Sequence, residues 1–217
     1  MNIILNNVSK TIQGATVIDD ISLELHSGYV YGLCGYNGCG KTMLMRLICG
    51  LISPSGGEIT IDGDVLGKRF DYAPNTGLLI ETPAFLKEYS GYKNLKILAD
   101  MKRKVSDEDI TDALLRVGLQ PDKKKVRKYS LGMKQRLGIA AALLEKPELL
   151  ILDEPTNALD ANGVEILSGI IPEEKARGAL VLLSCHDSAF LKQVSDIVFY
   201  MDNGKITERE ILRENSH

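Results

Sequence analysis

Apolar and polar residues follow two different patterns in the strand-like parts of the chain. They alternate in three segments, 2–5, 17–25 and 58–61, the last of which is followed by an Asp-Gly turn. A period of two is typical of strands with one buried face, so these segments predict a small antiparallel sheet. The segments 149–152 and 180–183 are wholly apolar instead, as expected of parallel strands covered on both faces. A further strand is predicted at 197–201.

The middle of the chain, from about residue 77 to residue 144, is helix-like. Its segment 91–101 carries apolar residues at helical spacing, and Ser106 precedes three acidic residues in the way typical of a helix start. A later helix is predicted to begin near Gly163. We expect it to break at Pro172, because proline removes a helical hydrogen bond.

One glycine-rich segment fits the phosphate-binding pattern G-x-x-x-x-G-K-[ST] at every position. It lies between a strand-like run at 29–34 and a helix-like run from Met43 onward, the setting that this motif needs. Its residues are Gly35, Tyr36, Asn37, Gly38, Cys39, Gly40, Lys41 and Thr42. The loop N–H groups would face phosphate oxygens, Lys41 would reach the β- and γ-phosphates, and Thr42 would bind Mg²⁺. We therefore expect this loop, with Met43, to bind ATP.

Two carboxylates follow the apolar strand predicted at 149–152. Asp153 and Glu154 would emerge at its carboxyl end, where open α/β sheets bind ligands. Asp153 is expected to hold Mg²⁺, which prefers oxygen ligands, and Glu154 to polarise the attacking water as a general base. A solvated acidic turn is the alternative, and a phosphate-binding loop earlier in the same chain counts against it.

Three further segments make the chain resemble the ATP-binding cassette (ABC) family. Ser130 and Gly132 match the family's L-S-G-G-Q signature, although the other three positions differ. A serine and a glycine at a helix start form a second phosphate cradle, and in this family it serves the nucleotide held by the other subunit. The resemblance also implies that Asp160 is the D-loop aspartate and that His186 is the switch histidine, which contacts the γ-phosphate.

The resemblance covers essentially the whole chain and implies a fold, a function and partners. The fold would be α/β, with a RecA-like P-loop NTPase core, an N-terminal antiparallel β subdomain and a helical subdomain. Residues 1–76 and 145–217 would form the β subdomain and the core, and 77–144 the helical subdomain. The chain would bind and hydrolyse ATP for an ABC transporter. Two such subunits, identical or different, would pack head to tail and act on integral membrane permease subunits.

Two positions depart from the family's pattern. Ile12 replaces the aromatic residue that usually stacks on adenine, so we expect weaker base discrimination, with GTP as a further candidate substrate. Tyr29 and Tyr31 are expected to pack on their strand instead. Glu81 stands where the family usually has a glutamine that senses Mg²⁺. A carboxylate there would be drawn to Mg²⁺ and repelled by the γ-phosphate, unless the change is a neutral substitution in a loop.

The residues around Glu81 also resemble one branch of the family. They are similar to the ATPase subunits of bacterial peptide-antibiotic exporters, of the lantibiotic-immunity and bacitracin-resistance types. The resemblance therefore implies the export of a small molecule or an antimicrobial peptide.

Composition and charge limit the kinds of partner and the cellular locations that fit this sequence. A net charge of −3 gives no overall basic field for nucleic acid, and the basic runs at 102–104 and 123–128 are interpreted as solvated surface. The longest wholly apolar run, 139–144, is too short to span a membrane, and no charged-then-apolar leader opens the chain. We expect a peripheral protein at the cytoplasmic face of the cell membrane. Four cysteines without C-x-x-C spacing predict reduced thiols.

Two other classes of protein compete with the transporter subunit. A soluble ABC-type ATPase that acts on ribosomes or DNA is disfavoured, because the chain has one cassette and no coiled-coil insertion before the signature. A P-loop kinase would not need the signature, D-loop and switch residues in this order.

Overall fold

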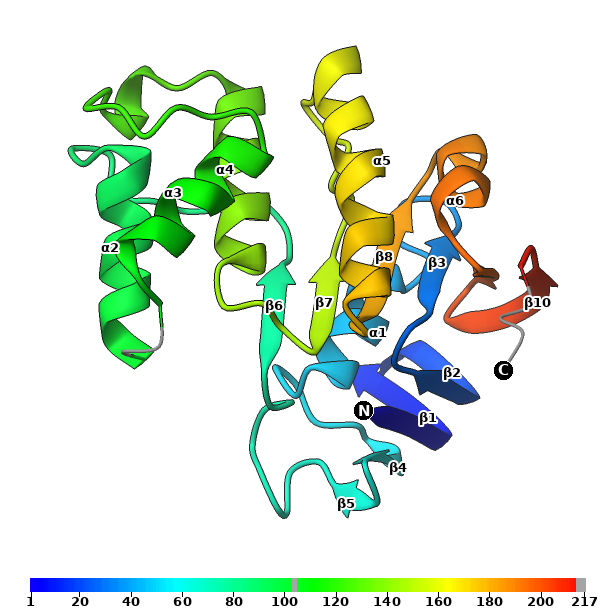
Figure 1. Ribbon diagram of the computed structural model, residues 1–217. Coiled ribbons are helices and arrows are strands. Elements are labelled where there is room, and N and C mark those ends of the chain that lie inside the picture. The colour runs from blue at the N-terminus through cyan, green and yellow to red at the C-terminus, as the bar shows by residue number, and fades with distance from the viewer. Residues whose placement is uncertain (103–104, 214–217) are drawn as a thin grey trace.

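Two β-sheets organise the part of the chain that this computed structural model describes, residues 1–102 and 105–213 (Figure 1). The smaller sheet is antiparallel and holds the N-terminal strands. The larger sheet is mostly parallel and occupies the centre of the molecule, and one group of helices lies to its side. Arg103 and Lys104, from one of the basic runs noted above, lie outside the described residues.

The smaller sheet has the strand order β2-β1-β4-β5, and its pairs are antiparallel, which confirms the prediction from alternation. Its strands are β1 (Asn2–Ile12), β2 (Ala15–His26), β4 (Gly56–Ile61) and β5 (Asp64–Val65). Alternate apolar side chains, among them Ile3, Leu5 and Ile21, are buried. They belong to one apolar cluster with helix α1 (Lys41–Ile48) and one face of the larger sheet.

The larger sheet has the strand order β10-β9-β3-β8-β7-β6. Its strands are β3 (Val30–Cys34), β6 (Thr76–Leu79), β7 (Leu149–Leu152), β8 (Leu180–Cys185), β9 (Ile197–Asp202) and β10 (Lys205–Ile211). All neighbours are parallel except β9 and β10. The carboxyl ends of β3, β7 and β8 therefore meet at one edge, and this is where the phosphate-binding loop and the two carboxylates follow their strands.

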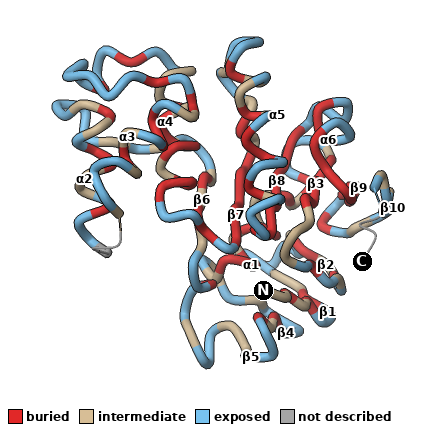
Figure 2. Tube along the Cα trace, viewed as in Figure 1, coloured by how far each residue is buried: buried red, intermediate tan, exposed pale blue. Residues whose placement is uncertain are grey.

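Strands β7 and β8 are buried along their whole length because both of their faces are covered (Figure 2). Leu149 and Ile151 belong to the apolar cluster shared with α1 and the smaller sheet. Leu150 and Leu152 face the opposite way and belong to a second cluster, shared with the remaining helices. The continuous apolar runs in the sequence have this double burial as their physical cause.

Helices of the second cluster come from two parts of the chain. Two of them, α5 (Ala161–Ala176) and α6 (Ser188–Val194), pack on β3 and β8. The others form the lateral group in Figure 1: α2 (Gly91–Lys102), α3 (Asp107–Arg116), the short 3₁₀ helix η1 (Val126–Lys128) and α4 (Leu131–Leu143). Ser106 caps α3 by accepting the N–H of Asp109, whose carboxylate accepts the N–H of Ser106 in return. The predicted helix start is thereby confirmed.

Two predicted elements are wrong. Residues 77–79, expected to open the helical part, belong to β6 (Thr76–Leu79), which pairs with β7 in parallel register. The four residues of β6 are too few to show a periodicity that separates strand from helix. Pro172 does not break its helix either, since α5 continues through it to Ala176. Leu167 and Ile171 are buried against the sheet before and beside the proline, so packing offsets the lost hydrogen bond.

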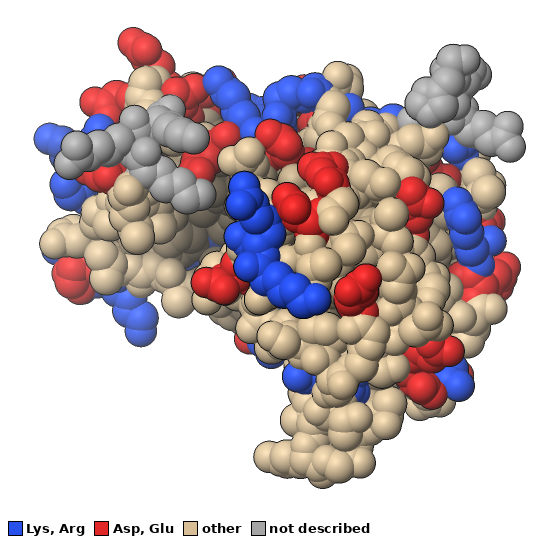
Figure 3. All heavy atoms as spheres, turned by 90° about the horizontal axis from the view of Figure 1, so that it is seen from below, with Lys and Arg blue, Asp and Glu red and all other residues tan. Residues whose placement is uncertain are grey.

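The molecular surface carries mixed charge. Seen from below, acidic and basic side chains lie interspersed over the same face (Figure 3). Within residues 1–102 and 105–213, none of the helices combines the length and the apolar character that crossing a membrane requires.

Candidate functional site

The phosphate-binding loop joins β3 to α1 at the carboxyl edge of the larger sheet. Gly40 caps the helix with a φ of 114°, a left-handed conformation that disfavours any side chain. A Cβ at Gly35 would lie 2.5 Å from the carbonyl oxygen of Met201 and 2.6 Å from Cys39 Sγ. These two glycines let the backbone turn sharply between a buried strand and a helix N-terminus, which is the geometry of an anion site.

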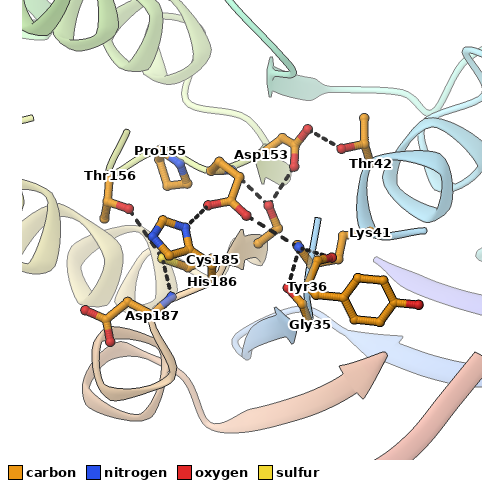
Figure 4. Close-up of polar contacts among 12 residues, drawn as sticks. Gly35, Tyr36, Lys41, Thr42, Asp153, Pro155, Thr156, Cys185, His186 and Asp187 are labelled. Carbon is orange, nitrogen blue, oxygen red and sulfur yellow. Dashed lines mark hydrogen bonds and ion pairs between the residues drawn. The ribbon is translucent and has the colours of Figure 1, made fainter. Parts of the chain in front are cut away.

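Lys41 lies inside this loop, with only 5% of its surface exposed (Figure 4). Its ammonium donates hydrogen bonds to the carbonyl oxygens of Gly35, at 2.7 Å, and Tyr36, at 3.2 Å. Nζ also lies 3.5 Å from Glu154 Oε1. A buried cation held by neutral carbonyls and one carboxylate can exchange these partners for phosphate oxygens, so the loop fits the triphosphate predicted from its sequence.

Asp153 joins three elements at the sheet edge. It follows β7, and its side chain is buried. The Thr42 hydroxyl on α1 donates to Oδ2 at 2.7 Å, and the Ser184 hydroxyl on β8 donates to Oδ1 at 2.6 Å. A hydroxyl and a carboxylate are hard oxygen donors, so Thr42 and Asp153 fit the Mg²⁺ ion that the motif requires.

Glu154 has a strained backbone, and one of its carboxylate oxygens accepts no hydrogen bond from the described residues. Its φ of 46° is left-handed, which is uncommon for a residue with a side chain and is characteristic of functional sites. Its N–H donates to Ser184 Oγ at 2.8 Å. Oε2 lies 3.0 Å from Nδ1 of His186, which follows β8. Oε1 is buried without a hydrogen bond from any described residue, so this carboxylate keeps an acceptor available for a further group.

The signature and D-loop residues form a second cluster. Ser130 caps α4 by accepting the N–H of Met133, and a Cβ at Gly132 would lie 2.7 Å from the carbonyl oxygen of Ala158. Asp160 caps α5 through the N–H of Gly163 and pairs with Arg136 at 2.5 Å. Both contacts hold the pKa of the Asp160 carboxyl below its usual value, the Gly163 N–H contributing more. Among the described residues, no hydrogen bond or ion pair joins Ser130, Gly132 or Asp160 to the phosphate-binding loop.

Family membership follows from comparison with known proteins. Residues 18–157 match the model of the ABC transporter family. The chain belongs to the ABC transporter family. This ABC protein is 45% identical to the ABC transporter ATP-binding protein YybJ of Bacillus subtilis (strain 168) over 213 residues, which are 97% of this chain and 98% of the relative. It is thus an ATP-binding subunit and an ATPase of the ABC type, as the resemblance implied.

Two relatives of this ABC subunit carry names that specify what they transport. The bacitracin transport ATP-binding protein BcrA of Enterococcus faecalis is 39% identical over 96% of this chain and 68% of its own length. The lantibiotic transport ATP-binding protein SrtF of Streptococcus pyogenes is 37% identical over 93% of this chain and 87% of its own length.

Solved ABC structures share the fold. A dimeric ATP-binding cassette in a post-hydrolysis state, bound to ADP and Pi, superposes with a TM-score of 0.88 at 21% identity, over 98% of this chain and all of that chain. The ATP-binding subunit of an ABC transporter gives a TM-score of 0.87 at 27% identity, over 98% of this chain and 90% of that chain. The predicted fold class, a RecA-like core with a β subdomain and a helical subdomain, is confirmed by this likeness.

No hydrogen bond or ion pair between described residues joins the side chains of the two departing positions to the carboxylate cluster. Ile12 ends β1, pairs with Ala15 across the hairpin and is 38% exposed. Glu81 has a left-handed φ of 59°, and its Oε1 accepts a hydrogen bond from Arg46 of α1 at 2.5 Å. The structure thus pairs Glu81 with a cation and not with Thr42 or Asp153, and its contact with Mg²⁺ stays a prediction.

Tyr29 and Tyr31 pack as expected, away from the phosphate-binding loop. Their rings stack with centroids 5.9 Å apart, and Tyr31 also stacks on Phe199 of β9 at 6.0 Å. Burial raises the pKa of Tyr31 to about 12, mainly through desolvation. The four cysteines are free and buried, in line with the reduced thiols predicted from their spacing.

Sequence reasoning missed three polar side chains that organise the site. Ser184 bridges the Asp153 side chain and the Glu154 backbone. The sequence feature that could have revealed it is a single hydroxyl residue near the end of an apolar strand. Gln135 of α4 donates to the carbonyl oxygen of Pro155 at 3.2 Å, tying the signature helix to the turn after β7. Arg46 of α1 is the partner of Glu81 and carried no signal in the local sequence.

Proposed function

We propose that this ABC subunit hydrolyses MgATP to drive export of an antimicrobial peptide or another small molecule through separate membrane subunits. The observation that carries the proposal is the convergence of Lys41, Thr42, Asp153, Glu154 and His186 at one sheet edge. The bacitracin and lantibiotic transport proteins among its relatives support the cargo class. The outward direction rests on the resemblance of the residues around Glu81 to peptide-antibiotic exporters.

Each residue at this edge has a proposed part in hydrolysis. The phosphate-binding loop, Gly35 to Met43, binds the triphosphate, and Lys41 stabilises the charge on its β- and γ-phosphates. Thr42 and Asp153 would hold Mg²⁺, which supplies charge neutralisation of the phosphate oxygens. The Glu154 carboxylate accepts a proton from the attacking water. His186 contacts the γ-phosphate and, through its 3.0 Å contact with Oε2, orients the Glu154 carboxylate.

The free acceptor on Glu154 suits this role. A general base must offer a lone pair that no protein donor occupies, and Oε1 accepts no hydrogen bond from the described residues. Lys41 lies 3.5 Å from this oxygen, beyond hydrogen-bond distance but close enough for electrostatic attraction. When Lys41 turns to phosphate, we expect Oε1 to become available to water.

A complete site is proposed to need two chains. In the described part of one chain, no hydrogen bond or ion pair joins Ser130, Gly132 or Asp160 to the phosphate-binding loop, so these residues can serve a nucleotide bound elsewhere. In a head-to-tail dimer, the signature of one subunit would face the loop of the other, in an arrangement with two-fold symmetry. The dimeric cassette with the same fold supports pairing. The second subunit is either another copy of this chain or a related chain.

The partners and location follow from the same reasoning. Integral membrane permease subunits would contact the helical subdomain, for which we propose residues from about 80 to 144, since 76–79 belong to the larger sheet. The β subdomain and core take up the rest of the chain. The subunit would therefore work as a peripheral protein at the cytoplasmic face of the cell membrane. With Ile12 in place of a stacking ring, GTP remains a second candidate substrate.

Glu81→Gln is expected to keep ATP binding and change the coupling of hydrolysis to transport. The substitution removes the ion pair between Glu81 and Arg46, which links the loop after β6 to the helix that starts at the phosphate-binding loop. Both side chains are partly or largely exposed, so the loss of stability should stay below about 1 kcal/mol. ATP affinity and turnover, measured with and without the membrane subunits, and peptide resistance of cells check this. Unchanged turnover and unchanged resistance would show that Glu81 is a neutral substitution.

Co-purification tests the function. Tagged Glu154→Gln subunit is expressed in its native host, membranes are solubilised in MgATP, and the chains that co-purify are identified by mass spectrometry. We expect a membrane protein with several spans, recovered in stoichiometric amount. Recovery of ribosomal or DNA-bound proteins without such a partner would replace the transporter by a soluble ABC-type ATPase.

A further inference from the structure

The carboxyl ends of β7 and β8 bring together a cysteine, a histidine and a glutamate. Cys185 ends β8, His186 follows it, and Glu154 lies in the turn after β7. Three possible ligand atoms lie within 4.8 Å of one another: Cys185 Sγ, a His186 ring nitrogen and a Glu154 carboxylate oxygen. In the proposed hydrolysis Glu154 and His186 have roles, whereas Cys185 has none.

This set of donors differs in kind from the Thr42–Asp153 pair. Thr42 and Asp153 offer only oxygen, which suits Mg²⁺. A thiolate with an imidazole and a carboxylate suits Zn²⁺, and three protein ligands with an open fourth position are usual where the ion also binds water. Zinc lies about 2.0–2.3 Å from ligands of these types. His186 Nδ1 and Glu154 Oε2 are 3.0 Å apart, so the two side chains need to separate only slightly for one ion to bind both atoms.

Two polar groups lie within hydrogen-bond distance of the Cys185 sulfur. Its Sγ accepts the N–H of Asp187 at 3.4 Å and lies 3.3 Å from Thr156 Oγ1 (Figure 4). A hydrogen bond donated to the ligand atom, as by the Asp187 N–H, orients and stabilises a metal-bound thiolate, and Thr156 can donate in the same way once Cys185 has lost its proton. The Cys185 side chain is buried, but the His186 side chain is 64% exposed, so an ion can enter from the His186 side.

We propose that Cys185, His186 and Glu154 bind Zn²⁺ in the nucleotide-free subunit and that the bound ion inhibits hydrolysis. The Cys185 S–H bond breaks, the sulfur bonds to zinc, and the proton leaves to water, without any change of oxidation state. A water molecule completes the fourth position. Inhibition rests on the proposed roles of Glu154 and His186, because the ion occupies both side chains. Zinc binding itself does not depend on those roles.

Cobalt spectroscopy tests the site directly. Metal-free, nucleotide-free full-length subunit is titrated with Co²⁺ in excess Mg²⁺, which occupies sites made only of oxygen. We expect a near-ultraviolet thiolate-to-cobalt charge-transfer band that one equivalent of Zn²⁺ removes. Cys185→Ser should abolish the band, and His186→Ala should weaken Co²⁺ binding at least tenfold. Cys49→Ser, at another buried free cysteine, is the matched control and should keep the band.

Two results would overturn the site. One is the absence of a charge-transfer band in the unaltered protein, and the other is a band that survives in Cys185→Ser. His186→Ala keeps the test decisive if Cys185→Ser does not fold, because the exposed His186 side chain contributes little to the core. A cobalt affinity unchanged in His186→Ala would then count against the cluster.

The inhibition is measured separately. ATP turnover is followed against Zn²⁺ concentration, each variant being referred to its own zinc-free rate. We expect Zn²⁺ to inhibit the unaltered subunit and Cys49→Ser at least tenfold more strongly than Cys185→Ser. Equal inhibition of all three would contradict zinc regulation through this cluster. If Glu154→Gln instead retained full turnover, the proposed catalytic role would fail while the cobalt band could still demonstrate the site.

Discussion

Glu154→Gln is expected to lower the turnover number for ATP hydrolysis by between about 10²- and 10⁴-fold, the range that general-base catalysis contributes. The amide keeps the shape of the side chain and its contact with His186, but it has no carboxylate to accept a proton from water. ATP binding should be retained or become tighter, because a negative charge near the triphosphate is removed. Steady-state hydrolysis and equilibrium ATP binding, measured on the same protein, check both parts.

The same variant should accumulate as an ATP-bound dimer. If hydrolysis reopens the pair, a subunit that binds ATP without cleaving it stays closed, and size-exclusion chromatography with light scattering in saturating MgATP should show twice the monomer mass. Glu165→Gln, an exposed carboxylate on α5, is the matched control and should behave as the unaltered protein. A strictly monomeric Glu154→Gln would contradict spontaneous pairing. Turnover within about threefold of normal would contradict the catalytic role.

Lys41→Ala is expected to reduce ATP affinity by about a hundredfold or more. Lys41 is the buried cation of the phosphate-binding loop, and two charge-assisted contacts to phosphate at about 1.5 kcal/mol each correspond to this loss. Ligand stabilisation provides the measurement. At a concentration 100 times its Kd, ATP should stabilise the unaltered subunit by about 2.7 kcal/mol, and the same concentration should barely shift the melting temperature of Lys41→Ala.

Lys41→Ala should also cost some stability without ligand. Its ammonium donates to the carbonyl oxygens of Gly35 and Tyr36, and removal leaves both without that donor, at a cost of about 1–3 kcal/mol. The affinity must therefore be compared at a temperature where both proteins are folded. Lys68→Ala, at an exposed lysine beyond β5, is the control for loss of a positive charge. An ATP-induced shift in Lys41→Ala equal to that of the control would refute the assignment.

Local sequence was sufficient for several elements of the fold. Alternation marked the smaller sheet, and the uninterrupted apolar runs marked β7 and β8, because their two faces are both buried. Local sequence was insufficient to predict elements in which tertiary packing overrides the local conformational preference. Strand β6 has too few residues to show a period, and only pairing with β7 makes it a strand. Pro172 is held in α5 by the buried side chains around it.

In the candidate site, too, some residues could be predicted from local sequence and others only from the fold. The phosphate-binding loop carries its function in contiguous residues, because a glycine-rich turn and a helix start are local geometry. Its partners come from distant segments that meet only because β3, β7 and β8 are parallel and end at one edge. This folding places Ser184 between Asp153 and Glu154, and it places Cys185 and His186 beside Glu154. No local pattern could assign those contacts.

The sequence by itself determined the family and most of the sheet-forming segments, and it predicted the residues that bind phosphate, since motifs and hydrophobic patterns are made of neighbouring residues. Only the tertiary structure decided which charges are paired. Glu81 was predicted to seek Mg²⁺, yet in the fold it meets Arg46, and Asp160 meets Arg136. Electrostatic interactions depend on distance and burial, not on separation along the chain, so the partner of a charged side chain is known only once the chain has folded.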